Sequence, residues 1–180
     1  MPSVEPPSVL YAHYGFRSGP RRFGTRPFNF MLDETMQNTE QIVINASKYE
    51  DDSTTLRLYP NNGLWSSYIR IYVNNSELRN LINSFRAYSG KREDGVDWSL
   101  GGPVDKWAYY LRIQCAPIDG SGHGNLRIRI EYPDHYNGGK SSDIIFNVVP
   151  QEINNFGELL ALALRNSNDD DVIWECGGFV

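Results

Sequence analysis

The fold is decided by the stretch YYLRIQCAPIDGSGHGNLRIRIEY, which spans residues 109–132. Apolar and polar residues alternate with a period of two on both sides of its glycine-rich centre. Leu111 and Ile113 before the centre share one face with Ile128 and Ile130 after it, and polar residues occupy the positions between them. This pattern predicts an antiparallel hairpin with one buried face.

Outward from the hairpin, short apolar or alternating runs predict further strands at 41–47, 54–59, 68–73 and 144–148. Two helices are predicted near 75–88 and 151–165, because apolar residues there recur at three- and four-residue spacing. The strand connections are short and turn-like, and a Gly- and charge-rich loop is expected at 90–104. We therefore predict the α+β class, with a two-layer, mainly antiparallel sheet and two helices packed on one face.

The chain of 180 residues fits one domain with an extension at each end. Residues 1–40 are rich in Pro, Gly and Arg and show no periodicity, so we expect an irregular N-terminal arm. Residues 41–165 are predicted to form a single α+β domain. Residues 166–180 are expected to be an acidic C-terminal tail, in which 172–174 could add a short strand. The acids of this tail account for most of the net charge of −5.

The composition is that of a globular protein, with 40% hydrophobic and 22% charged residues. No apolar run reaches the ~18 residues that a membrane span needs, so we expect no membrane partner. The N-terminus lacks the basic start and apolar run of a signal peptide. Two cysteines do not make a disulfide framework. We therefore expect a cytoplasmic protein with reduced thiols.

The sequence contains no Walker A, G-x-S-x-G, H-E-x-x-H or C-x-x-C motif. Asp119 and His123, with Asp134 and His135 nearby, could begin a metal site or an acid–base pair. Metal sites usually need three or four ligands, and the spacing fixes no third ligand here. Asp and His also suit turns, so we favour a structural role for them. We therefore predict that the chain is not an enzyme and that it has no catalytic, cofactor-binding or metal-ligating residue.

Basic and aromatic residues are predicted on the outer face of the sheet, opposite the apolar residues that would face the helices. Arg and Tyr are enriched in protein interfaces, and some single-stranded RNA binders use a basic, aromatic sheet. The low net charge outside the tail argues against a nucleic-acid partner, and the same arginines could pair with Glu131 or Asp143. With Trp98 of the 90–104 loop, the candidate partner-binding residues are Arg57, Tyr68, Arg70, Tyr72, Trp98, Tyr110, Arg112, Arg127 and Arg129.

Four motifs lie between residues 65 and 165: ELxxLIxxF at 77–85, YLRI at 110–113, DGSGHGxLxI at 119–128, and IIFxVxP at 144–150 leading to LLxL at 159–162. Together they resemble the WapI-type immunity proteins of bacterial polymorphic toxin systems and related immunity families. That family usually has an apolar residue after the Gly-His step, where this chain has Gly124. The resemblance implies a non-enzymatic protein that binds one cognate toxin and blocks its active site or substrate entry. A protein- or single-stranded-RNA-binding adaptor and a small metal-dependent hydrolase are the alternatives.

Overall fold

The computed structural model describes residues 39–91, 93–102, 109–120, 122–132, 140–166 and 168–177. The predicted N-terminal arm lies outside the described residues except for its last two positions. In chain order, the elements are β1 Glu40–Glu50, β2 Ser53–Asn62, β3 Ile69–Asn74, α1 Asn75–Arg86, β4 Val96–Gly101, β5 Tyr110–Pro117, β6 Gly124–Tyr132, β7 Lys140–Val148, α2 Pro150–Asn166 and β8 Asn168–Glu175.

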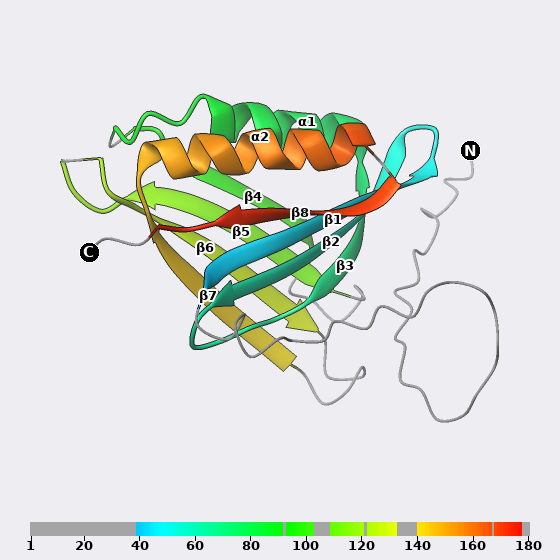
Figure 1. Cartoon of the computed structure of the whole chain (residues 1–180), viewed down its shortest axis with the longest axis horizontal. Helices are drawn as coiled ribbons and strands as arrows, with labels where there is room; N and C mark the ends of the chain where they lie inside the picture. The colour runs from blue at the N-terminus through cyan, green and yellow to red at the C-terminus, as the bar shows by residue number, and fades with distance from the viewer. Residues whose placement is uncertain are drawn as a thin grey trace, which may run out of the picture.

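The strands form two four-stranded antiparallel sheets (Figure 1). Sheet A has the order β3-β2-β1-β8, and sheet B has the order β4-β5-β6-β7. The α+β class and the antiparallel pairing are confirmed, but the sequence analysis expected one sheet. The division arises at the helices, because α1 leads from edge strand β3 of sheet A to edge strand β4 of sheet B. In the same way α2 leads from β7 to β8, at the other two edges.

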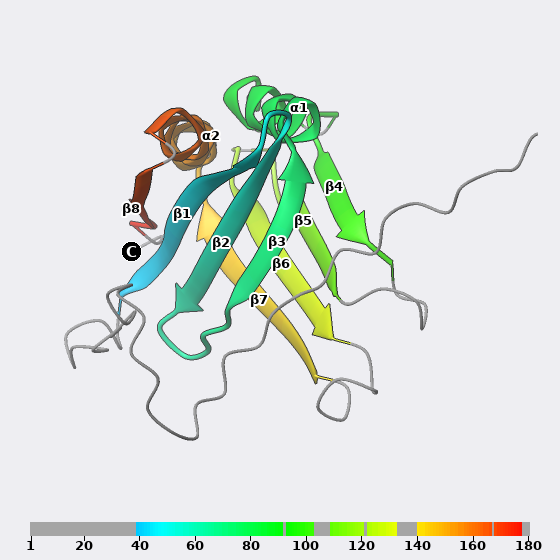
Figure 2. The ribbon, with the colours of Figure 1, turned by 90° about the vertical axis from the view of Figure 1, so that its right-hand side faces the viewer.

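The inner faces of the two sheets and the apolar sides of both helices share one hydrophobic core. The helices run side by side on the same side of the two sheets (Figure 2). Apolar residues of the predicted hairpin are buried in this core, with Ile113 opposite Ile128 across the β5–β6 pair. The strand residues therefore face the other sheet as well as the helices. Core members from the different elements include Ile44, Leu56, Ile71, Phe85, Leu111, Ile128, Phe146, Leu160 and Trp174.

The predicted loop at 90–104 contains a strand, which corrects the sequence analysis. Strand β4 pairs with β5, with Trp98 opposite Ile113. Val96 is buried and Trp98 packs against the core, while Asp97 between them points outward. This alternation covers only six residues that include Asp, Ser and Gly, and its signal is therefore weak beside the flanking glycines.

The segment assigned to an acidic tail also contains a strand, so the domain extends beyond residue 165. Strand β8 pairs with β1, and Trp174 lies opposite Ile42 with its side chain fully buried. The indole ring makes edge-to-face contacts with Phe146 of β7 and Phe156 of α2. Its Nε1 donates a hydrogen bond to the Glu152 carbonyl at 2.9 Å. The 172–174 strand is thus longer than predicted and contributes to the core.

The two helices approach each other closely at Gly157. A Cβ atom built there would lie 2.9 Å from the Cβ of Phe85 and 3.2 Å from the carbonyl oxygen of Ile82. Asn154, one turn earlier on α2, donates hydrogen bonds to three carbonyls at the end of α1. They belong to Phe85 at 2.9 Å, Arg86 at 3.2 Å and Tyr88 at 2.9 Å. The Phe85 carbonyl also accepts from the Tyr88 amide at 3.2 Å, so Asn154 adds a second donor there and reaches the carbonyls of Arg86 and Tyr88 at and just beyond the helix end. Thus α2 both packs on α1 and caps it.

Candidate functional site

The predicted partner-binding residues lie on two different sheets. Tyr110, Arg112, Arg127 and Arg129 are on the outer face of sheet B, and Arg57, Tyr68, Arg70 and Tyr72 are on the side of sheet A that faces away from the core. Trp98 joins neither set, because it packs on the core from β4. The expectation of a single Arg/Tyr face is therefore wrong. The expectation fails because period-two alternation shows which face of a strand is buried, but not which of two sheets the strand belongs to.

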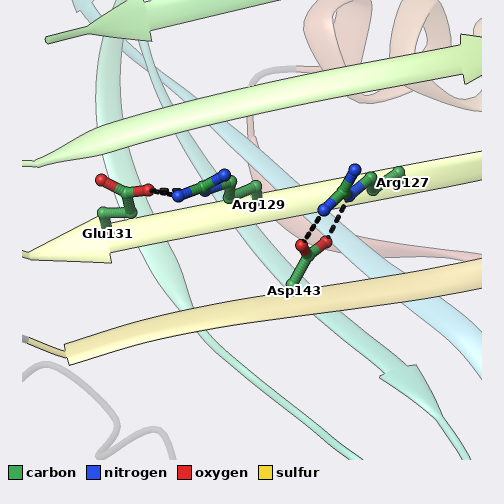
Figure 3. A network of polar contacts seen from close by, with 4 residues as sticks. All are labelled: Arg127, Arg129, Glu131 and Asp143. Atoms are coloured by element: carbon green, nitrogen blue, oxygen red, sulfur yellow. Dashed lines mark hydrogen bonds and ion pairs between the residues drawn. The ribbon is translucent and has the colours of Figure 1, made fainter. Parts of the chain in front are cut away.

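On sheet B, arginines of the outer face pair with carboxylates on the same or a neighbouring strand (Figure 3). Arg127 on β6 forms a two-bond pair with Asp143 on β7, with 2.7 Å between Nε and Oδ1. Arg129 donates to Glu131 at 2.5 Å. A second two-bond pair joins Arg112 to Asp97, at 2.9 and 2.6 Å. We call this surface the ion-paired face, and its residues are Asp97, Arg112, Gln114, Arg127, Arg129, Glu131 and Asp143.

The ion-paired face is electrically balanced, with three arginines and three carboxylates. The hydrogen bond from Arg127 lowers the pKa of Asp143, and that from Arg112 lowers the pKa of Asp97. Both carboxylates therefore stay charged and bound to their arginines near neutral pH. A nucleic-acid backbone would have to displace them, so the face favours a protein partner over single-stranded RNA.

On sheet A, the outer residues form pairs of aromatic rings around two arginines. The rings of Tyr59 and Tyr68 stack at 4.4 Å, and the guanidinium of Arg70 lies 5.6 Å from the ring centre of Tyr72. Arg57 donates to the Asn45 side chain at 2.5 Å. Burial is the main cause of a raised pKa at Tyr59. We call this surface the tyrosine–arginine face, and its residues are Tyr49, Arg57, Tyr59, Tyr68, Arg70 and Tyr72.

A third surface was missed by the sequence analysis, which named no candidate residue between Arg57 and Tyr68. The connection between β2 and β3 places two large apolar side chains in water, because Leu64 is 84% and Trp65 is 71% exposed. We call residues 61–66 the Leu64–Trp65 loop. The available signal was the pair of large apolar residues directly after an Asn-Asn-Gly turn, where polar residues are usual.

The Leu64–Trp65 loop has a fixed backbone. The Asn62 side chain accepts hydrogen bonds from the amides of Leu64 at 3.2 Å and Trp65 at 2.9 Å. The Asn61 side chain accepts one from Gly63 at 2.9 Å, and the φ of 80° at Gly63 suits glycine. The Asn62 amide also donates to the Trp65 carbonyl at 3.1 Å. The exposure of the two side chains is thus a property of an ordered loop.

This loop is attached to sheet B. The Asn62 side chain donates to the carbonyl of Ile145 on β7 at 3.3 Å, and Ile145 itself is exposed. Ser142 donates to Ser67 at 2.8 Å, just beyond the loop. Ile145 lies opposite Arg127 in the β6–β7 register. The loop therefore borders the ion-paired face, and the two surfaces can contact one partner together.

Asp119 and His123 contact each other at the β5–β6 turn. One carboxylate oxygen accepts from the His123 amide at 3.2 Å, and the other lies 2.7 Å from Nδ1 of the ring. The Ile118 amide donates to the His123 carbonyl at 2.7 Å. These bonds close the turn. The other predicted members, at 134 and 135, lie outside the described residues, and within the described ranges no group of three His, Cys, Asp or Glu side chains could hold a metal ion.

The chain matches no protein-family model, no curated protein and no solved structure. Neither α1 nor α2, the helices of the described ranges, is long and apolar enough to cross a membrane. Three surfaces of the described residues are the candidates for a partner: the ion-paired face, the tyrosine–arginine face and the Leu64–Trp65 loop.

Proposed function

We propose that this chain is a non-enzymatic, cytoplasmic immunity protein that binds and inhibits a cognate bacterial toxin. The observation that carries the binding function is the exposure of Leu64 and Trp65 on an ordered loop. Burial of large apolar side chains is the main favourable contribution to protein association, and tryptophan is the residue most enriched among hot spots. The assignment to a toxin rests on the sequence resemblance to immunity proteins.

The loop supports tight binding for an energetic reason. Ordering of flexible segments opposes association, and the hydrogen bonds of Asn61 and Asn62 already fix this backbone in the free protein. Trp65 can therefore enter a pocket of the partner with little loss of backbone entropy. The surrounding Asn and Ser side chains form the polar rim that is typical of such sites.

A stable complex needs about 800 Å² of surface from each partner, which is more than one loop provides. The ion-paired face supplies the remainder, since it adjoins the loop through Ile145 and Arg127. Its bidentate pairs hold the guanidinium and carboxylate groups in place, so a partner meets ordered donors and acceptors. Balanced charge also means that recognition depends on the positions of these groups rather than on long-range attraction.

The test is protection of bacteria from a toxin encoded beside this gene, with binding measured by calorimetry on the purified pair. We expect Trp65→Ala to weaken binding at least 30-fold, equal to about 2 kcal/mol, because a central aromatic anchor is lost. Ile118→Ala is the matched control, since Ile118 is 56% exposed on a different loop. It should leave the affinity within about 2-fold.

Two outcomes would contradict the proposal in different ways. Equal protection by the wild type and by folded Trp65→Ala would show that the interface lies elsewhere. Failure of the wild type to bind any product of a neighbouring gene would remove the immunity function itself. In that case the adaptor alternative is tested next, by titration of single-stranded RNA into the wild type and Arg127→Glu.

A further inference from the structure

The open edges of strands β7 and β3 are closed by side chains from the opposite sheet. At β7, the carbonyl of Ile145 accepts a hydrogen bond from the Asn62 side chain of sheet A at 3.3 Å. At β3, the Tyr132 hydroxyl of sheet B donates to the carbonyl of Tyr68, directly before the strand, at 2.9 Å. These contacts occupy backbone groups to which another strand could otherwise bind.

The other two edge strands are β8 and β4, and only β8 is protected by charge. Strand β8 carries the exposed acids Asp170 and Asp171. Strand β4, the edge strand on the right of Figure 2, has one charged residue, Asp97, whose carboxylate is already bound by the Arg112 guanidinium. Within the described ranges, no side chain forms a hydrogen bond with the backbone of β4. Strand β4 therefore presents an open edge of the kind that proteins usually block.

The open edge of β4 presents the backbone groups of alternate residues. The Ile118 amide donates to the His123 carbonyl at 2.7 Å, so alternate residues of β5, counted back from Ile118, bond to β6. The β5 residues between them bond to β4, and one of these is Ile113, which lies opposite Trp98. The remaining positions of β4 direct their amides and carbonyls away from β5, and they are Asp97, Ser99 and Gly101.

We propose that β4 pairs with β4 of a second copy of this chain, in an antiparallel register centred on Trp98. In this register Asp97 of each copy exchanges backbone hydrogen bonds with Ser99 of the other copy, through the groups that point away from β5. Val96 lies opposite Leu100 of the other copy, and Trp98 lies opposite its own counterpart. Apolar residues of the inner face therefore meet apolar residues, and the two copies of sheet B become one continuous sheet.

Charge and burial both favour this occupant and this register. A register centred on Asp97 would place two carboxylates opposite each other, which is unfavourable. The register centred on Trp98 places each carboxylate opposite the Ser99 hydroxyl, which can donate to it. Each Asp97 also keeps its own Arg112, so the edge brings no uncompensated charge to the other copy. Trp98 and Leu100 are only partly buried in one copy, and the added strand would cover them further.

This edge lies across sheet B from the Leu64–Trp65 loop. The strand order is β4-β5-β6-β7, and the loop is attached to β7 through the bond from Asn62 to Ile145. A dimer formed through β4 leaves the loop of each copy open to a partner. The proposal therefore does not depend on a toxin.

The experiment is sedimentation equilibrium of the full chain over a range of concentrations. We expect a monomer–dimer equilibrium with a dissociation constant on the order of 10 μM, because two short strands make a small interface. Ser99→Pro should weaken dimerisation roughly 100-fold, since it removes an outward amide and leaves the bonds between β4 and β5 intact. Ser99→Thr is the matched control, because threonine keeps the amide and suits a strand, and it should stay within about 3-fold of the wild type. Thermal unfolding of both variants confirms that they are folded.

NMR of a mixture of isotope-labelled and unlabelled wild type tests the register without any substitution. Contacts between the methyl groups of Val96 in one copy and Leu100 in the other would support the proposal, and a dimer without them would overturn it. A wild type that stays monomeric at millimolar concentration would also overturn it. Hydrogen exchange at Asp97 and Ser99 then identifies the alternative. Protected amides would show that another part of the same chain covers the edge, and exchanging amides would leave it open to a strand of a different protein.

Discussion

At the residue scale, the most consequential polar side chain is Asn154. Its single amide group donates to three carbonyls at the end of α1. We expect Asn154→Ala to lower the free energy of unfolding by roughly 1–3 kcal/mol, because the part-buried Tyr88 carbonyl loses this donor and the Phe85 carbonyl keeps only the Tyr88 amide. Asn155→Ala is the control, since Asn155 is exposed on the same helix, and it should change stability by less than about 0.5 kcal/mol. Urea denaturation measures both, and equal effects would contradict the capping role.

Some contacts at this scale follow from the sequence and others do not. The pairing of Arg127 with Asp143 and of Arg129 with Glu131 was one of two interpretations, because strand register places such residues side by side. The contacts of Asn154 depend on how two helices cross, for which its neighbours in the sequence carry no signal. The exposure of Trp65 was missed for a related reason. Composition predicts burial for tryptophan, and only the course of the loop shows that it is exposed.

At the element scale, the crossing of the two helices depends on Gly157. Gly157→Ala would gain about 1 kcal/mol of helix propensity if the position were open. Here the added Cβ would lie 2.9 Å from the Cβ of Phe85, which is close to the backbone and cannot move independently. We therefore expect a net loss of about 1–2 kcal/mol, through separation of the helices.

Gly120→Ala is the matched control, because a Cβ there meets no atom within 4 Å. Thermal unfolding of both variants measures the difference, and we expect Gly120→Ala to leave the melting temperature within about 2 °C. A stabilised Gly157→Ala variant would show that the helices can separate without loss of packing.

Elements with long, regular periodicity were predicted well from the sequence. The two helices and the β5–β6 hairpin lie where their apolar patterns placed them. Strand β4 was missed because Asp97 and Ser99 alternate with only three apolar residues between glycines. Strand β8 was predicted too short because its first half is acidic, and charge is usual in a solvent-exposed segment. That half lies at the edge of sheet A, where charged residues protect an open strand.

At the scale of the whole molecule, Trp174 joins the main parts of the fold. It belongs to sheet A, and its ring contacts Phe146 of sheet B and Phe156 of α2. We expect Trp174→Ala to destabilise the protein by about 3–5 kcal/mol, since a large buried ring leaves a cavity. Ile173→Ala is the control on the opposite face of the same strand, where Ile173 is 44% exposed, and it should cost less than about 1 kcal/mol. A similar loss for both variants, measured by urea denaturation, would show that β8 is peripheral.

The arrangement of two sheets could not be predicted from local patterns. Each strand shows which of its faces is apolar, and this information is the same whether that face meets a helix or another sheet. The two sheets are separate because α1 and α2 each connect an edge strand of one sheet to an edge strand of the other. Eight of the nine candidate residues were therefore assigned to one surface when they occupy two, and Trp98, assigned to a loop, packs against the core from β4.

The pairing of β1 with β8 has a consequence for the order in which the protein can fold. Asn45 and Asp171 are hydrogen-bonded across this pair although they are 126 positions apart in the chain. A contact of such separation must overcome a large loss of chain entropy before it contributes, so it forms late and slows folding. During synthesis, the edge of β1 that pairs with β8 stays unpaired until β8 leaves the ribosome, more than a hundred residues after β1. Throughout that interval the nascent chain exposes an unpaired β-strand edge, the feature that chaperones shield and that otherwise leads to aggregation.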